Sequence, residues 1–154
     1  MFKTVYSLIL FMFLASCGSK QGVALPVSTS SADSPVVKKL NAHYKEWRGV
    51  RYAEGGMSKN GIDCSGFVHL AYKQKLRKKI PRSTERLSSA GSSVQLNKIR
   101  PGDVMFFKTG WKTRHVGIYV GKGDFIHASS SRGVMKSNLK NPYWSEAYWM
   151  SRRY

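Results

Sequence analysis

Helical patterns precede Pro101-Gly102 in this chain, and strand-like patterns follow it. Ser34-Pro35 is typical of a helix start, because serine caps a helix and proline suits its first position. Apolar residues then recur at helical spacing, at Val36, Val37, Leu40, Tyr44 and Trp47. Helices are also expected from Cys64 and over 83–90, and strands over 103–107, 115–120, 124–128 and 147–150. Helices followed by strands favour an α+β domain, with helices packed on an antiparallel sheet.

The first sixteen residues are expected to be a targeting segment rather than part of the fold. In residues 1–16 a single lysine precedes an apolar run from Val5 to Ala15, which is too short to span a bilayer as a helix. The run ends in Leu14-Ala15-Ser16-Cys17, which resembles the lipobox of bacterial lipoproteins. That resemblance implies a lipoprotein signal peptide and acylation of Cys17 with palmitate-like chains. Two or more such chains hold a protein stably at a membrane. Glycine after the cysteine favours the outer membrane, with the domain facing the periplasm.

Residues 17–34 are expected to form a lipidated cysteine and a flexible tether, because they are rich in serine and hold no aromatic residue. The folded domain is then predicted over residues 35–154. An ordinary secretion signal with an incidental Cys17 is the alternative. Since the chain has two cysteines, acylation of Cys17 would leave Cys64 as a free thiol in an oxidising compartment, which is unusual.

Cys64 has the setting that a nucleophile needs. At the first turn of a helix it would lie at the positive end of the helix dipole, which lowers a thiol pKa and favours the nucleophilic thiolate. The small neighbours Ser65 and Gly66 leave backbone N–H groups accessible to a substrate carbonyl, as in an oxyanion hole. The alternative is a buried structural cysteine that packs as a small apolar residue.

Two histidines are candidates for the base. His115 begins one predicted strand, and His127 lies near the end of the next. A three-residue loop at 121–123 would place both on one face as diagonal neighbours, about 7–8 Å apart at Cα, whereas a two-residue loop would point them to opposite faces. On one face they would supply a base and the group that orients it. His43 and His69 are expected at the surface.

A zinc site is the rival use of Cys64, His115 and His127. Zinc ligands usually include a local pair such as C-x-x-C or H-E-x-x-H, which this sequence lacks. The sequence therefore predicts neither a metal nor a cofactor.

The chain is strongly basic, with 26 Lys and Arg against 8 Asp and Glu and a formal net charge of +18. A dense basic stretch runs over 73–82. In a cytosolic protein such a stretch would suggest binding to nucleic acid, but an exported lipoprotein does not encounter nucleic acid. Anionic lipid headgroups and the carboxylates of peptidoglycan are the accessible partners, and a solvated helix face is the alternative reading.

A set of short motifs extends over nearly all of residues 35–154. It comprises Gly49–Tyr52, Gly55-Gly56, Gly61–Val68, Pro81–Thr84, Gly102-Asp103, Arg114–Tyr119, Phe125–Val134 and Pro142–Trp144. This combination resembles that of the NlpC-type cell-wall cysteine peptidases. The resemblance implies a compact papain-like fold and hydrolysis of amide bonds in peptidoglycan stem peptides. It gives Cys64 the role of nucleophile, His115 that of base, and His127 that of the residue orienting the base.

The same resemblance implies further site residues. Tyr52 corresponds to a tyrosine that lines the active site and assists the oxyanion, while Asp63 and Ser65 correspond to positions that contact polar groups of the substrate. A plain aromatic packed under the loop is the alternative for Tyr52. The chain departs from the family pattern at Ala53-Glu54, which separates Tyr52 from the double glycine.

The expected substrate is the D-alanyl–diaminopimelate cross-link of peptidoglycan. The protein is expected to act as a monomer. With only a tether ahead of the core, the groove is expected to be open at both ends and to admit two peptide strands. The alternatives are hydrolysis of the γ-D-glutamyl–diaminopimelate bond and a non-catalytic lipoprotein that binds the wall.

Overall fold

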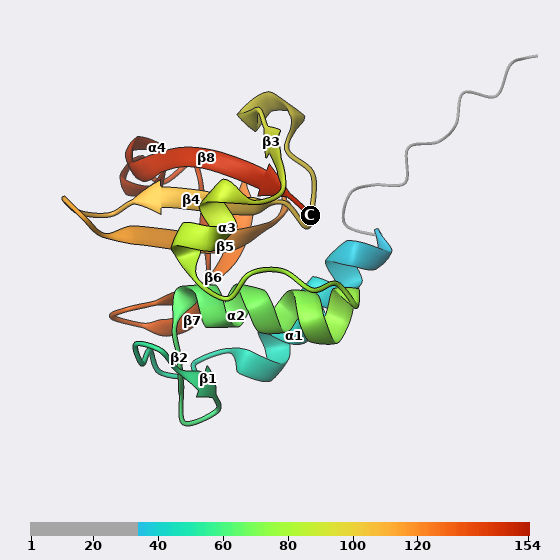
Figure 1. The fold of residues 1–154 in the computed structure, drawn as a ribbon, viewed down its shortest axis with the longest axis vertical. Coiled ribbons are helices and arrows are strands. Elements are labelled where there is room, and N and C mark those ends of the chain that lie inside the picture. Colours follow the sequence, from blue (N-terminus) through green and yellow to red (C-terminus); the bar gives the residue numbers. More distant parts are fainter. Residues whose placement is uncertain (1–33) are drawn as a thin grey trace, which may run out of the picture.

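The computed structural model describes residues 34–154, which form an antiparallel sheet covered by helices (Figure 1). The predicted signal peptide, Cys17 and the tether lie outside the described residues. Three helices precede most of the sheet, namely α1 (Pro35–Trp47), α2 (Cys64–Ala71) and α3 (Thr84–Ser89), and a π-helical turn, η2 (Tyr72–Leu76), extends α2. The predicted α+β class and the predicted starts of α1 and α2 are confirmed.

The main sheet has six strands in the order β3-β8-β4-β5-β6-β7, with every neighbouring pair antiparallel. Its strands are β3 (Ser92–Val94), β4 (Val104–Lys108), β5 (Arg114–Gly121), β6 (Asp124–Ser129), β7 (Gly133–Asn138) and β8 (Tyr148–Arg153). A 3₁₀ turn, η3 (Leu96–Lys98), follows β3. The short strands β1 (Met57–Ser58) and β2 (Gly61–Ile62) form a separate hairpin directly before α2.

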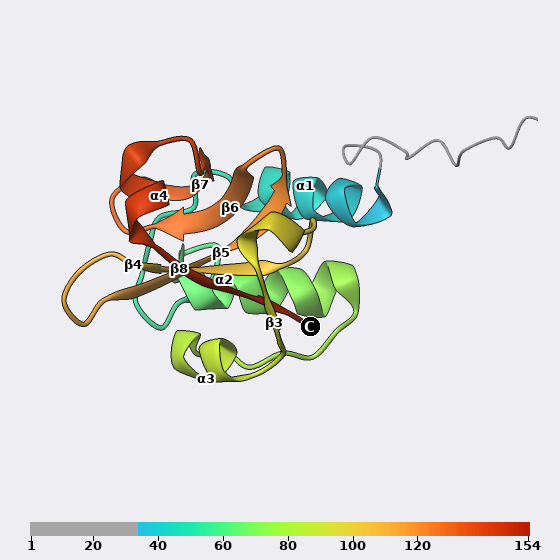
Figure 2. The ribbon, with the colours of Figure 1, turned by 90° about the horizontal axis from the view of Figure 1, so that it is seen from above.

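The main core lies between the sheet and the helices α1 to α3. Figure 2 shows α2 running along one face of the sheet, with α1 and α3 on either side of it. Alternation along β4 sends Val104 and Phe106 into this core and Met105 and Phe107 to the opposite face. All four side chains are fully buried, so both faces of the sheet are covered at β4.

The opposite face is covered by α4 (Pro142–Ala147), which the sequence patterns do not reveal. Trp144 of α4 packs against Phe107 and Phe125, with ring centroids 4.9 and 5.1 Å away. The helix has only six residues and no apolar period, but its start is marked by Asn141-Pro142, where the Asn141 side chain accepts a hydrogen bond from the Tyr143 N–H.

The surface prediction for His43 is wrong. Its side chain is fully buried in α1, between the rings of Trp47 and Phe67, and its Nε2 lies 3.3 Å from the Phe67 carbonyl oxygen. Burial lowers the pKa of His43 to about 4. His43 follows Leu40 by three residues and precedes Trp47 by four, so the helical period already places it on the apolar face. His69 is half-buried, with Nδ1 3.0 Å from the Ile80 carbonyl oxygen.

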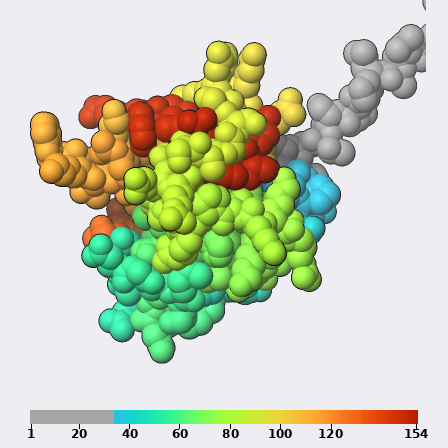
Figure 3. All heavy atoms as spheres, viewed as in Figure 1, coloured from blue at the N-terminus to red at the C-terminus, as the bar shows by residue number. Residues whose placement is uncertain are grey.

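The basic stretch over 73–82 lies along η2 and the segment that follows it, on the face shown in Figure 3. Lys73, Lys78 and Lys79 are exposed, while Lys75 pairs with Glu46 at 2.5 Å. Arg82 is also in an ion pair, with Asp63, and Lys78 donates to the Tyr154 carbonyl, so about half of this charge is available to an anionic surface. Among the described residues, none of the helices has the length and apolar character needed to cross a membrane.

Candidate active site

Cys64 is the first residue of α2, and the helix begins there because Asp63 caps it. The Asp63 carboxylate accepts a hydrogen bond from the Gly66 N–H at 2.7 Å, as an N-cap residue does. β2 ends at Ile62, so the chain turns from strand to helix directly before the thiol. The side chain of Cys64 is only 6% exposed. The Gly66 N–H is taken up by this cap, whereas the N–H groups of Cys64 and Ser65 have no backbone partner in the described part of the chain and lie next to the sulfur.

Arg82 holds the start of α2 from the opposite side. Its guanidinium donates to Asp63 Oδ1 at 3.0 Å and Oδ2 at 2.7 Å, and to Ser65 Oγ at 2.8 Å. A Cβ on Gly66 would lie 2.7 Å from the Gly56 carbonyl oxygen and 3.0 Å from Arg82, so this close approach requires glycine. Burial alone would raise the pKa of Asp63, but the hydrogen bonds from Arg82 and the Gly66 N–H hold it below its usual value.

This network bears on the predicted substrate contacts. Asp63 and Ser65 are both buried, and their oxygens already bind each other and Arg82. Their role toward substrate stays a prediction, while their role in positioning the first turn of α2 follows from the geometry. Arg82 completes the set; it lies in the Pro81–Thr84 motif, to which the sequence patterns assign no role at the site.

The thiol itself lies between α3 and β5. Cys64 Sγ is 3.9 Å from the Thr84 hydroxyl, and the backbone of Val116 hydrogen-bonds to the sulfur. Val116 follows His115, so the thiol lies one residue along the strand from the predicted base. Burial raises the pKa of the Cys64 thiol, and these hydrogen bonds offset the effect only in part. The expectation of a lowered thiol pKa is therefore wrong for the resting site, because desolvation outweighs the helix terminus.

The predicted contact between the two histidines is confirmed, although the loop differs from the prediction. β5 pairs with β6 through Ile118↔Ile126 and Tyr119↔Phe125, which is the register expected for the three-residue loop. Gly121 instead pairs with Asp124, so the turn has two residues, Lys122 and Gly123, both with positive φ. A register shift between Tyr119 and Gly121 compensates for the missing loop residue and returns both histidines to one face.

The two imidazoles form a chain of hydrogen bonds. His115 Nε2 lies 2.8 Å from His127 Nδ1, and His127 Nε2 lies 2.9 Å from the hydroxyl of Ser137 on β7. This leaves Nδ1 of His115 as the nitrogen that can take a proton from a thiol. The ring of Trp144 packs on both imidazoles, with centroids 5.6 and 5.0 Å away. The sequence patterns assign Ser137 and Trp144 no role at the site, because β7 and α4 have no local signal in the sequence.

Burial determines the protonation of these imidazoles. It lowers the pKa of His115 to about 4. Burial, followed by the charges of His115 and Arg132, lowers the pKa of His127 to about 3. At neutral pH both rings are therefore neutral, and the resting site combines a neutral thiol with a neutral base.

Tyr52 lies beside the same turn. It forms an isolated parallel bridge with Ile62, two residues before Cys64. Burial, then the charges of Cys64 and Asp63, raise the pKa of Tyr52 to about 12. The phenol thus keeps its proton at neutral pH and can donate a hydrogen bond to an oxyanion next to the sulfur. Tyr52 therefore lies near the turn that carries Cys64, and its role toward the oxyanion stays a prediction.

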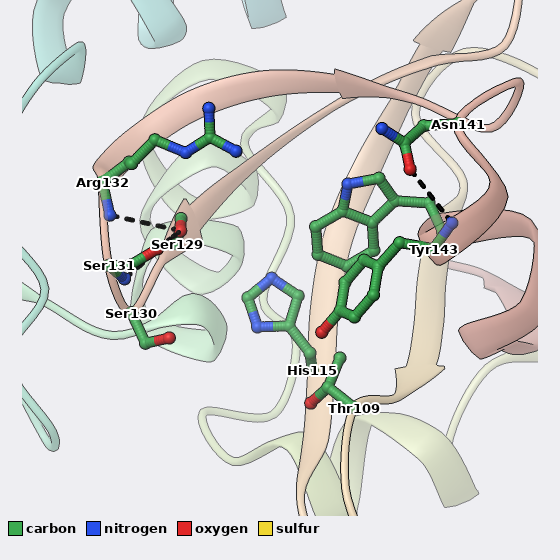
Figure 4. Close-up of a pocket in the computed structure, with 9 residues that line it drawn as sticks. Thr109, His115, Ser129, Ser130, Ser131, Arg132, Asn141 and Tyr143 are labelled. Carbon is green, nitrogen blue, oxygen red and sulfur yellow. Dashed lines mark hydrogen bonds between the residues drawn. The ribbon is translucent and has the colours of Figure 1, made fainter.

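His115 lines part of a cavity of about 280 Å³. Figure 4 shows Ser129 to Arg132, from the β6–β7 turn, on one side of it, and Asn141 and Tyr143 on the other, with His115 between them. Its lining is mostly hydroxyl, amide and aromatic groups, and Trp144 completes it. The cavity is open to solvent next to the predicted base.

The buried imidazoles predict a pH dependence of stability. The pKa values of His43, His115 and His127 lie at about 4, 4 and 3, below the 6.5 of an unfolded histidine. Between these values the unfolded chain binds more protons, so the free energy of unfolding falls as pH falls from about 6.5 to 4. We expect a slope of up to about 1.4 kcal/mol per pH unit for each imidazole.

Urea unfolding at neutral and mildly acidic pH measures this slope. His43→Leu removes one buried imidazole far from the thiol. It should reduce the slope of the free energy of unfolding against pH by about the contribution of one imidazole. A free energy of unfolding that does not change between neutral pH and about pH 5 would contradict the burial of these rings as neutral groups.

Comparison with known proteins identifies the family. The model of the NlpC/P60 family matches residues 49–153. The chain belongs to the NlpC/P60 family. The predicted family and fold are thereby confirmed. The chain is 40% identical over 151 residues to "Probable endopeptidase NlpC" of Escherichia coli (strain K12), covering 96% of this chain and 98% of that protein.

Two further proteins are similar to this chain over a smaller share of their own length. "Murein DD-endopeptidase MepS/Murein LD-carboxypeptidase" of Escherichia coli (strain K12) is 43% identical over 118 residues, which is 77% of this chain and 63% of that protein. The crystal structure of an NlpC/P60 family protein from Bacillus cereus is 34% identical with a TM-score of 0.69, covering 77% of this chain and 40% of that chain. The described fold is thus that of solved NlpC/P60 domains.

Proposed function

We propose that this NlpC/P60 protein is a cysteine endopeptidase that cleaves D-alanyl–diaminopimelate cross-links in peptidoglycan. Family membership and the two endopeptidase relatives support a hydrolase that acts on peptidoglycan. The observation that carries the chemistry is the position of Cys64 at the start of α2, a helix that packs on β5 and β6, the two strands that bear the linked imidazoles of His115 and His127. A wall-binding protein has no need of this combination.

The neutral resting site indicates general-base catalysis. His115 takes the thiol proton at Nδ1 as the sulfur of Cys64 attacks the D-alanyl carbonyl carbon. The negative charge that develops on the carbonyl oxygen is stabilised by backbone N–H groups at the start of α2 and by the Tyr52 hydroxyl. His115 then gives the proton to the leaving amine as the carbon–nitrogen bond breaks, leaving a thioester. Water, activated by His115, hydrolyses the thioester and restores the thiol.

His127 and Ser137 hold the base in position. The imidazole of His127 fixes Nε2 of His115 at 2.8 Å, and Ser137 fixes His127 at 2.9 Å. Each hydrogen bond restricts the rotation and tautomer of the ring before it, which leaves Nδ1 of His115 free to accept a proton. One chain supplies all of these groups, so a monomer is sufficient for hydrolysis.

The choice of bond rests on the relative named as a murein DD-endopeptidase, which is 43% identical over the domain. The test is digestion of purified cross-linked muropeptide dimers and of monomeric stem peptides, with product masses as the readout. We expect dimers to be converted to intact monomers. Clipped monomeric stems with dimers untouched would instead establish the γ-D-glutamyl–diaminopimelate bond, and no product from either substrate would leave the wall-binding alternative.

We also propose that the chain is a lipoprotein of the outer membrane, anchored through Cys17 and facing the periplasm. The support is the lipobox-like Leu14-Ala15-Ser16-Cys17 and the exposed lysines of the 73–82 stretch, which suit an anionic surface. Cys17→Ser should abolish incorporation of labelled fatty acid and release a domain that still folds and hydrolyses muropeptides. Absence of label on the unsubstituted chain would contradict lipidation.

A further inference from the structure

The leaving half of the substrate must contact His115. In the proposed reaction His115 protonates the departing amine, so the nitrogen and the carbon attached to it lie against this imidazole. His115 also forms part of the wall of the cavity in Figure 4. The groups carried by the carbon next to the leaving nitrogen therefore reach this cavity first.

The cavity has one charged side chain, and that charge is positive. The described residues that line it are Thr109, His115, Ser129, Ser130, Ser131, Arg132, Asn141, Tyr143 and Trp144. None is acidic. The Arg132 side chain is exposed and takes part in none of the ion pairs or side-chain hydrogen bonds found among residues 34–154. Its guanidinium can therefore bind an anion without first breaking an internal contact.

The backbone that carries Arg132 is held in place. The Ser129 hydroxyl accepts hydrogen bonds from the N–H groups of Ser131 and Arg132 at 3.4 and 3.3 Å. Directly after them, the Val134 N–H donates to the Val50 carbonyl at 2.9 Å, which ties the turn to the segment after α1. Only the side chain of Arg132 has to be ordered when an anion binds, which reduces the entropic cost of recognition.

Resting on the proposed function, we infer that this cavity is the subsite for the leaving residue and that Arg132 binds its free carboxylate. In a D-alanyl–diaminopimelate cross-link, the carbon that bears the leaving nitrogen also bears a free carboxylate. In the γ-D-glutamyl–diaminopimelate bond, the corresponding carboxyl is joined to the next residue of the stem when that residue is present. Recognition of the carboxylate by Arg132 therefore favours the cross-link over the stem bond.

Binding to the full chain with Cys64→Ala tests this contact apart from hydrolysis. The probes are two purified cross-linked dimers that differ in one group, the carboxylate next to the scissile nitrogen, which is free in one and a carboxamide in the other. Each is titrated by calorimetry against the Cys64→Ala protein and the same protein with Arg132→Gln. Arg77→Gln, at the far end of the helical segment that begins at Cys64, removes a guanidinium that is also exposed and serves as the control.

We expect Arg132→Gln to weaken binding of the free-carboxylate dimer about tenfold or more and to leave the carboxamide dimer within about twofold. Arg77→Gln should change neither. Equal weakening of both dimers, no weakening of either, or no measurable binding of the free-carboxylate dimer would overturn the inference. Cleavage of the same dimers by the unsubstituted chain is followed in parallel, and uncut dimers would overturn the proposed function by themselves.

Discussion

Cys64→Ala is expected to abolish peptidoglycan hydrolysis, with a loss of about 10⁴-fold or more in kcat, because alanine leaves the carbonyl carbon without a nucleophile. His115→Ala should cause a loss of similar size, since the thiol is neutral at rest and needs a base to be activated. The Cys64→Ala/His115→Ala double variant should be no slower than either single variant, because the two groups act in one step. His127→Ala should retain measurable turnover, since it acts through His115.

Initial rates on purified muropeptides, with folding checked by circular dichroism, measure these losses. His69→Gln is the matched control, because His69 lies on the same helix and hydrogen-bonds to the Ile80 carbonyl. It should change the rate by about twofold at most. Near-normal turnover by Cys64→Ala, or losses that multiply in the double variant, would reject thiol chemistry by a Cys64–His115 pair.

Asp63→Ala is expected to have the largest effect on stability, a loss of about 2–4 kcal/mol in the free energy of unfolding. It removes the N-cap of α2, which contributes about 1 kcal/mol, and leaves the partly buried guanidinium of Arg82 without its carboxylate. Asp63→Asn keeps a capping oxygen and removes the charge, so it should lose less. Because Asp63 precedes the thiol, both variants should also lower kcat.

Urea unfolding of these variants measures the effect, with Glu46→Gln as the control. Glu46 pairs with Lys75 at 2.5 Å, but its side chain is 49% exposed, and exposed pairs contribute little. We expect Glu46→Gln to change the free energy of unfolding by less than about 1 kcal/mol. If Asp63→Ala is no more destabilising than Glu46→Gln, the Asp63–Arg82 network does not hold the start of α2.

The main elements of the fold could be predicted because their sequence signals are local. Pro35 after a serine, the apolar period of α1 and the strand-forming composition of β4 to β6 each indicate an element by themselves. β7 and α4 have no such signal, since β7 mixes apolar and polar residues and α4 has only six. Their stability comes from packing on the sheet, which a single local pattern does not contain.

The residues of the candidate site also fall into those that local sequence patterns predict and those that they do not. Cys64, His115 and His127 were found because nucleophile and base chemistry limits the residue types, and strand parity then tests whether two histidines can meet. Arg82, Thr84 and Ser137 act on these residues from other elements, so their roles depend on tertiary contacts. The raised pKa of Cys64 cannot be predicted for a related reason, because a helix start is visible in the sequence while the burial of the thiol is not.

Digestion of the cross-linked dimer in water enriched in heavy oxygen tests the central claim most directly. Hydrolysis through a Cys64 thioester places one solvent oxygen on the carbonyl carbon that the sulfur attacked. The fragment masses of the unsubstituted chain's products should place that oxygen in the terminal D-alanine carboxyl of the donor stem, and Cys64→Ala should give no labelled product. Label in the D-glutamyl γ-carboxyl, or the same labelled product from Cys64→Ala, would contradict attack by Cys64 on the D-alanyl cross-link.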